Sequence, residues 1–204
     1  MHDSEILENM LSAARDDLDF FSNSGKEARE RWVVSEFLKV IKCSFEEKEI
    51  SSLEQASKVD VKFRDASFQI KEIANPLLLR GKKVKDTYNV IKNADTLEDI
   101  ELPSIIEDVP SVAKMYDLLV SETRKLSESA VYKDVKQDLD LIFYITRTRA
   151  SLIQEQSINT NDFSDLGWRS VTCLNGKQAV VFHTKSDAPE FLKEYSGQVI
   201  AIGN

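Results

Sequence analysis

Alternating hydrophobic and polar residues predict a β-hairpin over residues 59–73. The apolar positions are Val61, Phe63, Phe68 and Ile70, and the polar positions between them are Asp60, Lys62, Gln69 and Lys71. A period of two places the polar set on one face of the hairpin and the apolar set on the other. With the turn centred on Asp65 and Ala66, Asp60 would lie opposite Lys71, and Lys62 opposite Gln69. The pattern therefore predicts a polar patch containing Asp60, Gln69 and Lys71 above an apolar floor.

Helical periodicity appears in three other segments, residues 3–21, 26–42 and 111–129, where apolar residues recur at steps of three and four. The nearly continuous apolar run 139–146 predicts a central strand covered on both faces. A second hairpin is predicted over 168–183, around Asn175 and Gly176. A short helix after residues 186–189 and a last strand at 198–202 follow.

This order of elements predicts one domain over residues 1–204, of the α/β (α+β) class, with a mixed β-sheet flanked by helices. The middle segment, at about 77–131, is expected to be helical and partly irregular, since residues 96–110 hold two prolines and many acids.

Charge and composition bear on three questions: non-specific binding of nucleic acid, membrane spans and the cellular setting. The formal net charge of −8 counts against a protein that coats nucleic acid non-specifically, which needs a basic field, but not against a nuclease with local basic residues. No apolar run reaches the roughly 20 residues of a membrane span. An acidic N-terminal segment and only two cysteines, Cys43 and Cys173, favour a reducing, cytoplasmic setting.

The polar patch of the hairpin suggests metal-dependent phosphodiester chemistry. A carboxylate (Asp60) and an amide oxygen (Gln69) are ligands that a hard divalent cation accepts, and Lys71 could act near an attacking water. Glu30, on the preceding helix, could supply a third oxygen. The alternative is an ordinary hairpin with its polar face in water, and a solvated Glu30 paired with a neighbouring arginine.

Six basic residues are candidates for phosphate contact: Arg29, Arg31, Lys82, Lys83, Arg147 and Arg169. Residues 80–85 form the most basic segment of the chain, although so short a run is also typical of a solvated loop or helix start. Neither histidine lies near a candidate nucleophile, and no Walker A, G-x-G-x-x-G or G-x-S-x-G sequence occurs.

Several segments resemble an uncharacterised bacterial family of putative endonucleases with a restriction-endonuclease-like, PD-(D/E)xK-type fold. The matching pieces are F-F-S-N, R-E-R-W-V at 29–33, D-V-K-F-R-D-A-S-F at 60–68, G-W-R-S-V at 167–171 and S-D-A-P-E-F-L at 186–192. The resemblance implies that Asp60 is the first strand acid, Lys71 the lysine and Glu30 the helix acid of the motif. Gln69 stands where an acid is more usual.

The resulting expectation is Mg²⁺- or Mn²⁺-dependent phosphodiester hydrolysis on nucleic acid, with Asp60, Gln69 and Lys71 as catalytic residues and Asp60, Gln69 and Glu30 as metal ligands. The rival is an inactive binding or adaptor module on the same fold, acting through protein–protein contacts, with a homodimer as one form of it. A third reading, a small-molecule enzyme, would need a closed pocket at the same patch.

Overall fold

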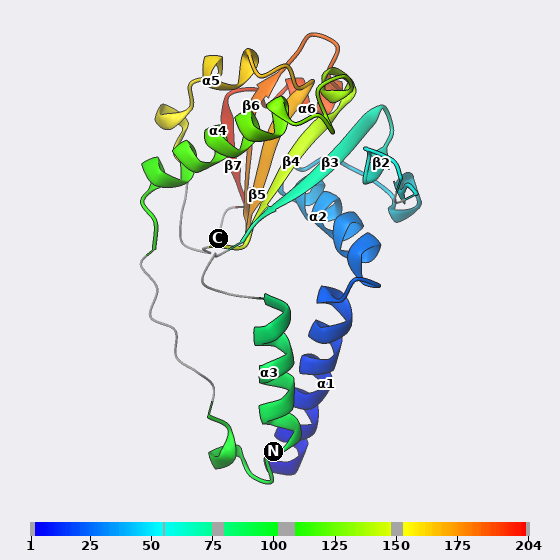
Figure 1. Cartoon of the computed structure of the whole chain (residues 1–204), viewed down its shortest axis with the longest axis vertical. Coiled ribbons are helices and arrows are strands. Elements are labelled where there is room, and N and C mark those ends of the chain that lie inside the picture. The colour runs from blue at the N-terminus through cyan, green and yellow to red at the C-terminus, as the bar shows by residue number, and fades with distance from the viewer. Residues whose placement is uncertain (1–2, 55, 75–79, 102–108, 148–152, 203–204) are drawn as a thin grey trace. The chain divides into compact units, whose positions relative to one another are not determined.

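The computed structural model of the chain describes residues 3–54, 56–74, 80–101, 109–147 and 153–202 (Figure 1). These residues fall into two compact units. One comprises the described residues within 1–29 and 76–108, and the other those within 30–75 and 109–204. The middle segment at 77–131 is thus divided, because its first helix pairs with the N-terminal helix whereas its last helix covers the sheet.

The larger unit is built on a seven-stranded sheet whose spatial order follows the chain order. The strands are β1 (Ile50–Ser52), β2 (Val61–Phe63), β3 (Ala66–Ile73), β4 (Asp140–Ile145), β5 (Ser170–Asn175), β6 (Gln178–Thr184) and β7 (Gln198–Ala201). β3, β4 and β5 run parallel to one another, and the other neighbours are antiparallel. The predicted mixed sheet is confirmed, and the restriction-endonuclease-like assignment stays a prediction.

Each face of the sheet carries its own apolar cluster. Helix α2 (Lys26–Val40) contributes Val34 and Phe37 to a cluster that includes Phe68 and Ile142. Helix α4 (Val112–Glu128), on the opposite face, contributes Leu119 to a cluster with other strand residues. The members of that cluster on β4 are Leu141, Phe143 and Ile145. Successive residues of β4 therefore enter different clusters, which confirms the predicted central strand covered on both sides.

Short helices complete the larger unit. They are η1 (Glu47–Glu49), η3 (Lys136–Asp138), η4 (Glu155–Ser157), α5 (Asn161–Ser164) and α6 (Glu190–Lys193). The hairpin predicted around Asn175 and Gly176 is confirmed, with its turn one residue later, since Asn175 pairs with Gln178. Gly176 has φ of +58°, a conformation that suits glycine at a tight turn.

The smaller unit is a pair of helices, α1 (Asp3–Phe21) and α3 (Arg80–Lys92), followed by η2 (Leu97–Asp99). Figure 1 shows α1 and α3 side by side and antiparallel. Helix α1 has the predicted bounds, and the basic segment at 80–85 begins α3. Among the described helices, none has the length and apolar character needed to cross a membrane.

The first hairpin forms, but the predicted centre of its turn was wrong. Phe63 pairs with Ala66, so the turn residues are Arg64 and Asp65. Arg64 adopts a positive φ of 51°. Its guanidinium donates hydrogen bonds to Glu49 Oε1 (3.1 Å) and to the Ser44 carbonyl (2.8 Å), and these contacts hold the turn in this register. The shift places Lys62 opposite Ser67 instead of Gln69.

Candidate functional site

The polar face of the hairpin lies on the α4 side of the sheet. Val61 and Phe68 belong to the α2-side cluster, so the residues that alternate with them point the other way. At the turn end of this face, Lys62 Nζ donates to Ser67 Oγ at 2.5 Å. Asp60 and Gln69 come next, and Lys71 follows Gln69 about 6.5 Å further along β3. The register therefore brings the three predicted catalytic residues together on one face.

Asp60 is half-buried, and its carboxylate is tied to β3. Oδ2 accepts the Ile70 backbone N–H at 2.8 Å and also the Gln69 side-chain amide Nε2–H. The Asp60 N–H in turn donates to the Phe68 carbonyl at 2.8 Å. Asp60 thus extends the pairing of the hairpin, and Gln69, which is buried, turns its nitrogen towards the carboxylate.

Lys71 is half-buried against an aromatic ring. Its Nζ lies 5.3 Å from the centroid of the Tyr132 ring, within range of a cation–π interaction. Tyr132 is buried and its ring lies 5.4 Å from that of Trp168. Tyr132 is absent from the predicted site residues, because it follows α4 in a turn that is distant from the hairpin in sequence, and no local pattern connects the two.

Glu30 lies on a different side of the sheet from the hairpin site. It is almost buried on α2, whose neighbouring residues Val33 and Val34 pack on the face opposite to Gln69 and Lys71. The structure therefore does not bring Glu30 onto the polar face of Asp60. Among the described residues, no group of three or more His, Cys, Asp and Glu side chains is placed to hold a metal ion.

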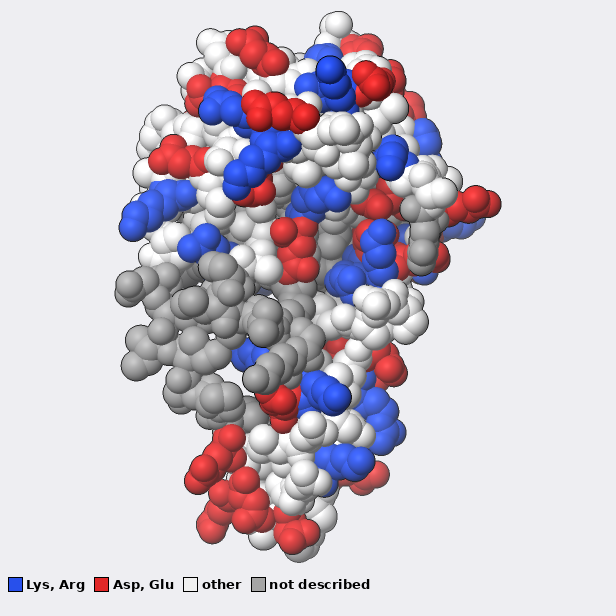
Figure 2. All heavy atoms as spheres, in the orientation of Figure 1, with Lys and Arg blue, Asp and Glu red and all other residues white. Residues whose placement is uncertain are grey.

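The six candidate phosphate-binding residues divide between the two units, with Arg29, Lys82 and Lys83 in the smaller unit and the other three in the larger one. Arg29 Nη1 donates to the Phe20 carbonyl at 2.5 Å and so caps the end of α1, while Arg31 Nη1 donates to Ser52 Oγ at 2.8 Å. Lys83 is exposed on α3 and Arg147 is half-buried after β4. The Lys82 side chain lies outside the described residues. Figure 2 shows acidic and basic side chains interspersed on the viewed face of the larger unit.

Arg169 belongs to a second polar network, around the fully buried Asp140. Its guanidinium donates to both carboxylate oxygens of Asp140, Nε to Oδ1 at 3.1 Å and Nη2 to Oδ2. Burial lowers the pKa of Arg169, but the hydrogen bond and charge of Asp140 outweigh it, so the pKa lies above its ordinary value. Ser170 Oγ and the Ser67 N–H complete the donors to Asp140, each at 2.8 Å. Arg169 is therefore engaged in an internal ion pair.

Comparison with known proteins gives a family and a fold. Residues 2–204 match the model of a family described as "Putative endonuclease, protein of unknown function (DUF1780)". A solved structure of a protein of unknown function from Pseudomonas aeruginosa strain PAO1, described as monooxygenase superfamily, aligns with a TM-score of 0.59 and 22% identity. That alignment covers 100% of this chain and 97% of the other, and it concerns the fold. No curated protein matches.

Proposed function

The chain belongs to this family of putative endonucleases, and from that premise we propose that it is a metal-dependent endonuclease that hydrolyses phosphodiester bonds in nucleic acid on a restriction-endonuclease-like fold. The observation that carries the proposal is the placement of Asp60, Gln69 and Lys71 on one face of the first hairpin. An acid, an amide and an ammonium group at adjacent positions are the groups such a reaction requires.

The donor set fits one hard divalent cation. Mg²⁺ and Mn²⁺ prefer oxygen ligands, and Asp60 supplies a carboxylate beside the Gln69 amide. The amide nitrogen now donates to Asp60. A half-turn of the amide would bring its oxygen next to the carboxylate, an arrangement that a cation would stabilise. When bound, the cation would lower the pKa of a water molecule and neutralise phosphate charge.

Lys71 performs the remaining chemistry in this proposal. Its ammonium group would orient the attacking water and stabilise the negative charge that develops on the phosphate oxygens. The Tyr132 ring restricts the positions open to the ammonium group.

The test is a cleavage assay on closed circular DNA and on labelled single-stranded DNA and RNA, with Mn²⁺ or Mg²⁺. We expect cleavage that a chelator abolishes and that falls by about 100-fold or more in Lys71→Met, the loss typical of removing one group that stabilises transition-state charge. Lys62→Met is the matched control, since it removes the same charge from the same face, and it should keep activity within about tenfold. Absence of cleavage by the folded wild type, or full activity of Lys71→Met, would overturn the proposal.

A specific observation favours a second candidate, a non-catalytic binding module. The Gln69 amide and the Ile70 N–H already satisfy Asp60 Oδ2, which is the arrangement of a structural carboxylate. In that case Asp60 only stabilises the hairpin. Calorimetric titration with Mn²⁺ separates the two candidates: binding that Asp60→Ala abolishes supports the endonuclease, and no binding by a folded wild type, together with no cleavage, supports the module.

A further inference from the structure

Helix α1 carries half-buried apolar side chains both on the stripe that follows a helix–helix seam and beside it. One stripe follows the heptad spacing of a helix–helix seam, with members Leu7, Leu11, Ala14, Leu18 and Phe21. Ala14 is buried, whereas the other members are half-buried. Ile6, Met10 and Phe20 lie beside this stripe and are also half-buried. Ile6 and Met10 thus widen the apolar face in the first half of α1, and the next positions on that side, Ala13 and Asp17, are exposed. A widened apolar face is typical of a helix with more than one helical neighbour.

Helix α3 repeats this pattern. Val84, Tyr88 and Ile91 recur at steps of four and three, and only Ile91 of these is buried. Thr87 and Val90 form a second, half-buried stripe next to them. The α1–α3 pair therefore presents apolar side chains that its own seam leaves partly open to solvent. A pair of helices of this length is marginally stable by itself.

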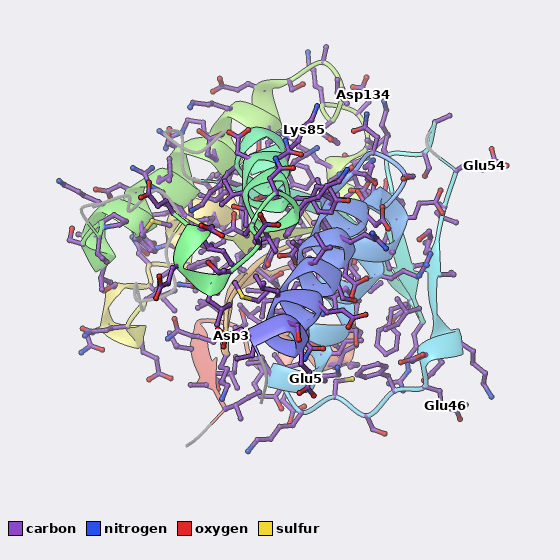
Figure 3. All side chains as sticks on the ribbon, turned by 90° about the horizontal axis from the view of Figure 1, so that it is seen from below. Asp3, Glu5, Glu46, Glu54, Lys85 and Asp134 are labelled. Atoms are coloured by element: carbon purple, nitrogen blue, oxygen red, sulfur yellow. The ribbon has the colours of Figure 1, made fainter. Side chains whose placement is uncertain are left out.

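The two helices have opposite charge. Helix α1 contains six acidic residues and one arginine, and helix α3 contains five basic residues and one aspartate. Lys83 and Lys85 of α3 are exposed. Figure 3 labels Asp3 and Glu5 towards the start of α1, and Lys85 on α3. An additional helical neighbour of α1 should therefore be basic, and an additional neighbour of α3 should be acidic.

A second copy of the same helix pair meets both requirements. We propose that the protein is a homodimer in which the α1–α3 pairs of two chains pack around a two-fold axis as a four-helix bundle. In this arrangement α1 of one protomer contacts α3 of its partner, so every neighbouring pair of helices has opposite charge. A pairing of α1 with α1 would instead juxtapose two acidic helices. The dimer goes beyond the proposed nuclease activity and does not depend on it.

The first test is the mass of the full chain by light scattering coupled to size-exclusion chromatography. We expect twice the 23.2 kDa of one chain, at concentrations up to about 100 μM, well above the dissociation constant of a specific dimer. Ile6→Glu/Met10→Glu places two charges on the widened apolar face of α1 and should give a monomer. The matched control, Asn9→Glu/Ser12→Glu, adds the same charges at exposed positions of α1 and should remain dimeric.

The second test leaves the apolar stripes intact and changes only exposed charges. Lys83→Glu/Lys85→Glu should weaken dimerisation by about tenfold or more at low ionic strength, because acidic α1 of the partner then faces acidic residues on α3. Lys114→Glu/Lys133→Glu, an equal charge change at exposed positions in and just after α4, should leave dimerisation unaltered. If circular dichroism shows that Ile6→Glu/Met10→Glu has lost helix, the comparison of Lys83→Glu/Lys85→Glu with Lys114→Glu/Lys133→Glu tests the proposed interface instead.

Two results would overturn the proposal. The first is a wild-type chain that is monomeric at about 100 μM, since a specific dimer should be populated there. The second is a wild-type dimer that persists in both Ile6→Glu/Met10→Glu and Lys83→Glu/Lys85→Glu, because its interface would then lie outside α1 and α3.

Discussion

Two carboxylates next to β3, those of Asp140 and Asp60, differ in burial and in hydrogen-bond partners. The difference distinguishes a structural carboxylate from a candidate functional one. Asp140 is fully buried and receives the guanidinium of Arg169, the Ser170 hydroxyl and the Ser67 N–H. Asp60 is half-buried and bound to its own hairpin through Gln69 and Ile70. A buried carboxylate paired with an arginine and other fixed donors is a structural element. A carboxylate within reach of solvent, on the same face as a lysine, can meet a substrate.

The Asp140 network reaches the turn of the hairpin that carries the candidate site. Arg169 Nη2 donates to the Asp65 carbonyl at 3.1 Å, in the turn between β2 and β3. Asp140 on β4 accepts the Ser67 N–H directly at 2.8 Å. Three segments of the sheet are thereby joined at the turn end of the hairpin that carries Asp60 and Gln69. Asp140 and Asp60 thus belong to separate hydrogen-bond networks of the same sheet.

The largest effect should come from removing the structural carboxylate. Asp140→Ala leaves the Arg169 guanidinium, whose side chain is only 14% exposed, without its buried partner. We expect a loss of about 3–5 kcal/mol in the free energy of unfolding, the usual result of breaking a buried ion pair. Urea denaturation measures it. Glu122→Ala, which breaks the exposed pair with Lys125, is the control and should change stability by less than about 1 kcal/mol.

A smaller effect is expected when the candidate site is made more acidic. Gln69→Glu replaces the amide that donates to Asp60 with a second carboxylate, so we expect a loss of about 1–3 kcal/mol in metal-free stability from the missing donor and the like charge. Mn²⁺ affinity should rise by about tenfold, since the charge of the ligand set increases. Calorimetry and denaturation with and without Mn²⁺ give both values. Unchanged affinity would count against a metal site here.

The smallest effect should come from the aromatic contact of Lys71. Tyr132→Leu keeps an apolar side chain against Trp168 and removes the ring face that the ammonium group contacts. The lost cation–π interaction corresponds to about 0.5–2 kcal/mol, so cleavage should fall by about 2- to 30-fold, less than for Lys71→Met. The ratio of kcat to KM before and after substitution provides the measurement. A Tyr132→Leu variant as impaired as Lys71→Met would assign the ring a role of its own.

The sequence predicted the elements better than their register. Period-two alternation identified β2 and β3, because a strand with one buried face alternates apolar and polar residues. The apolar run 139–146 identified β4, because a strand buried on both faces is apolar at nearly every position. The turn was placed one residue too late, since its position depends on contacts of Arg64 with Glu49 and Ser44 that are distant in the chain. Asp60, Gln69 and Lys71 still share a face, because a shift by one position on each strand preserves the alternation of this hairpin.

Other features depend on tertiary packing and left no local signal. Asp140 is one acid inside a hydrophobic run, and its partner Arg169 follows 29 residues later. The sequence therefore predicts a phosphate contact for Arg169 and gives no sign of its ion pair with Asp140. Glu30 precedes the hairpin closely in sequence, but α2 packs on the face of the sheet opposite to the polar patch, and the periodicity of α2 does not specify that face. Tyr132 lies in a turn whose proximity to Lys71 only the fold creates.

The most direct test compares Asp60→Asn with Asp140→Asn in both stability and cleavage. Asparagine at position 60 can still accept the Ile70 N–H, so we expect Asp60→Asn to lose about 2 kcal/mol or less in the free energy of unfolding. The same variant should lose cleavage by about 100-fold or more. For Asp140→Asn, the main loss should be in the free energy of unfolding. Its cleavage activity should fall only in proportion to the fraction of protein that is unfolded. An Asp60→Asn protein that is folded and cleaves like the wild type would contradict the account.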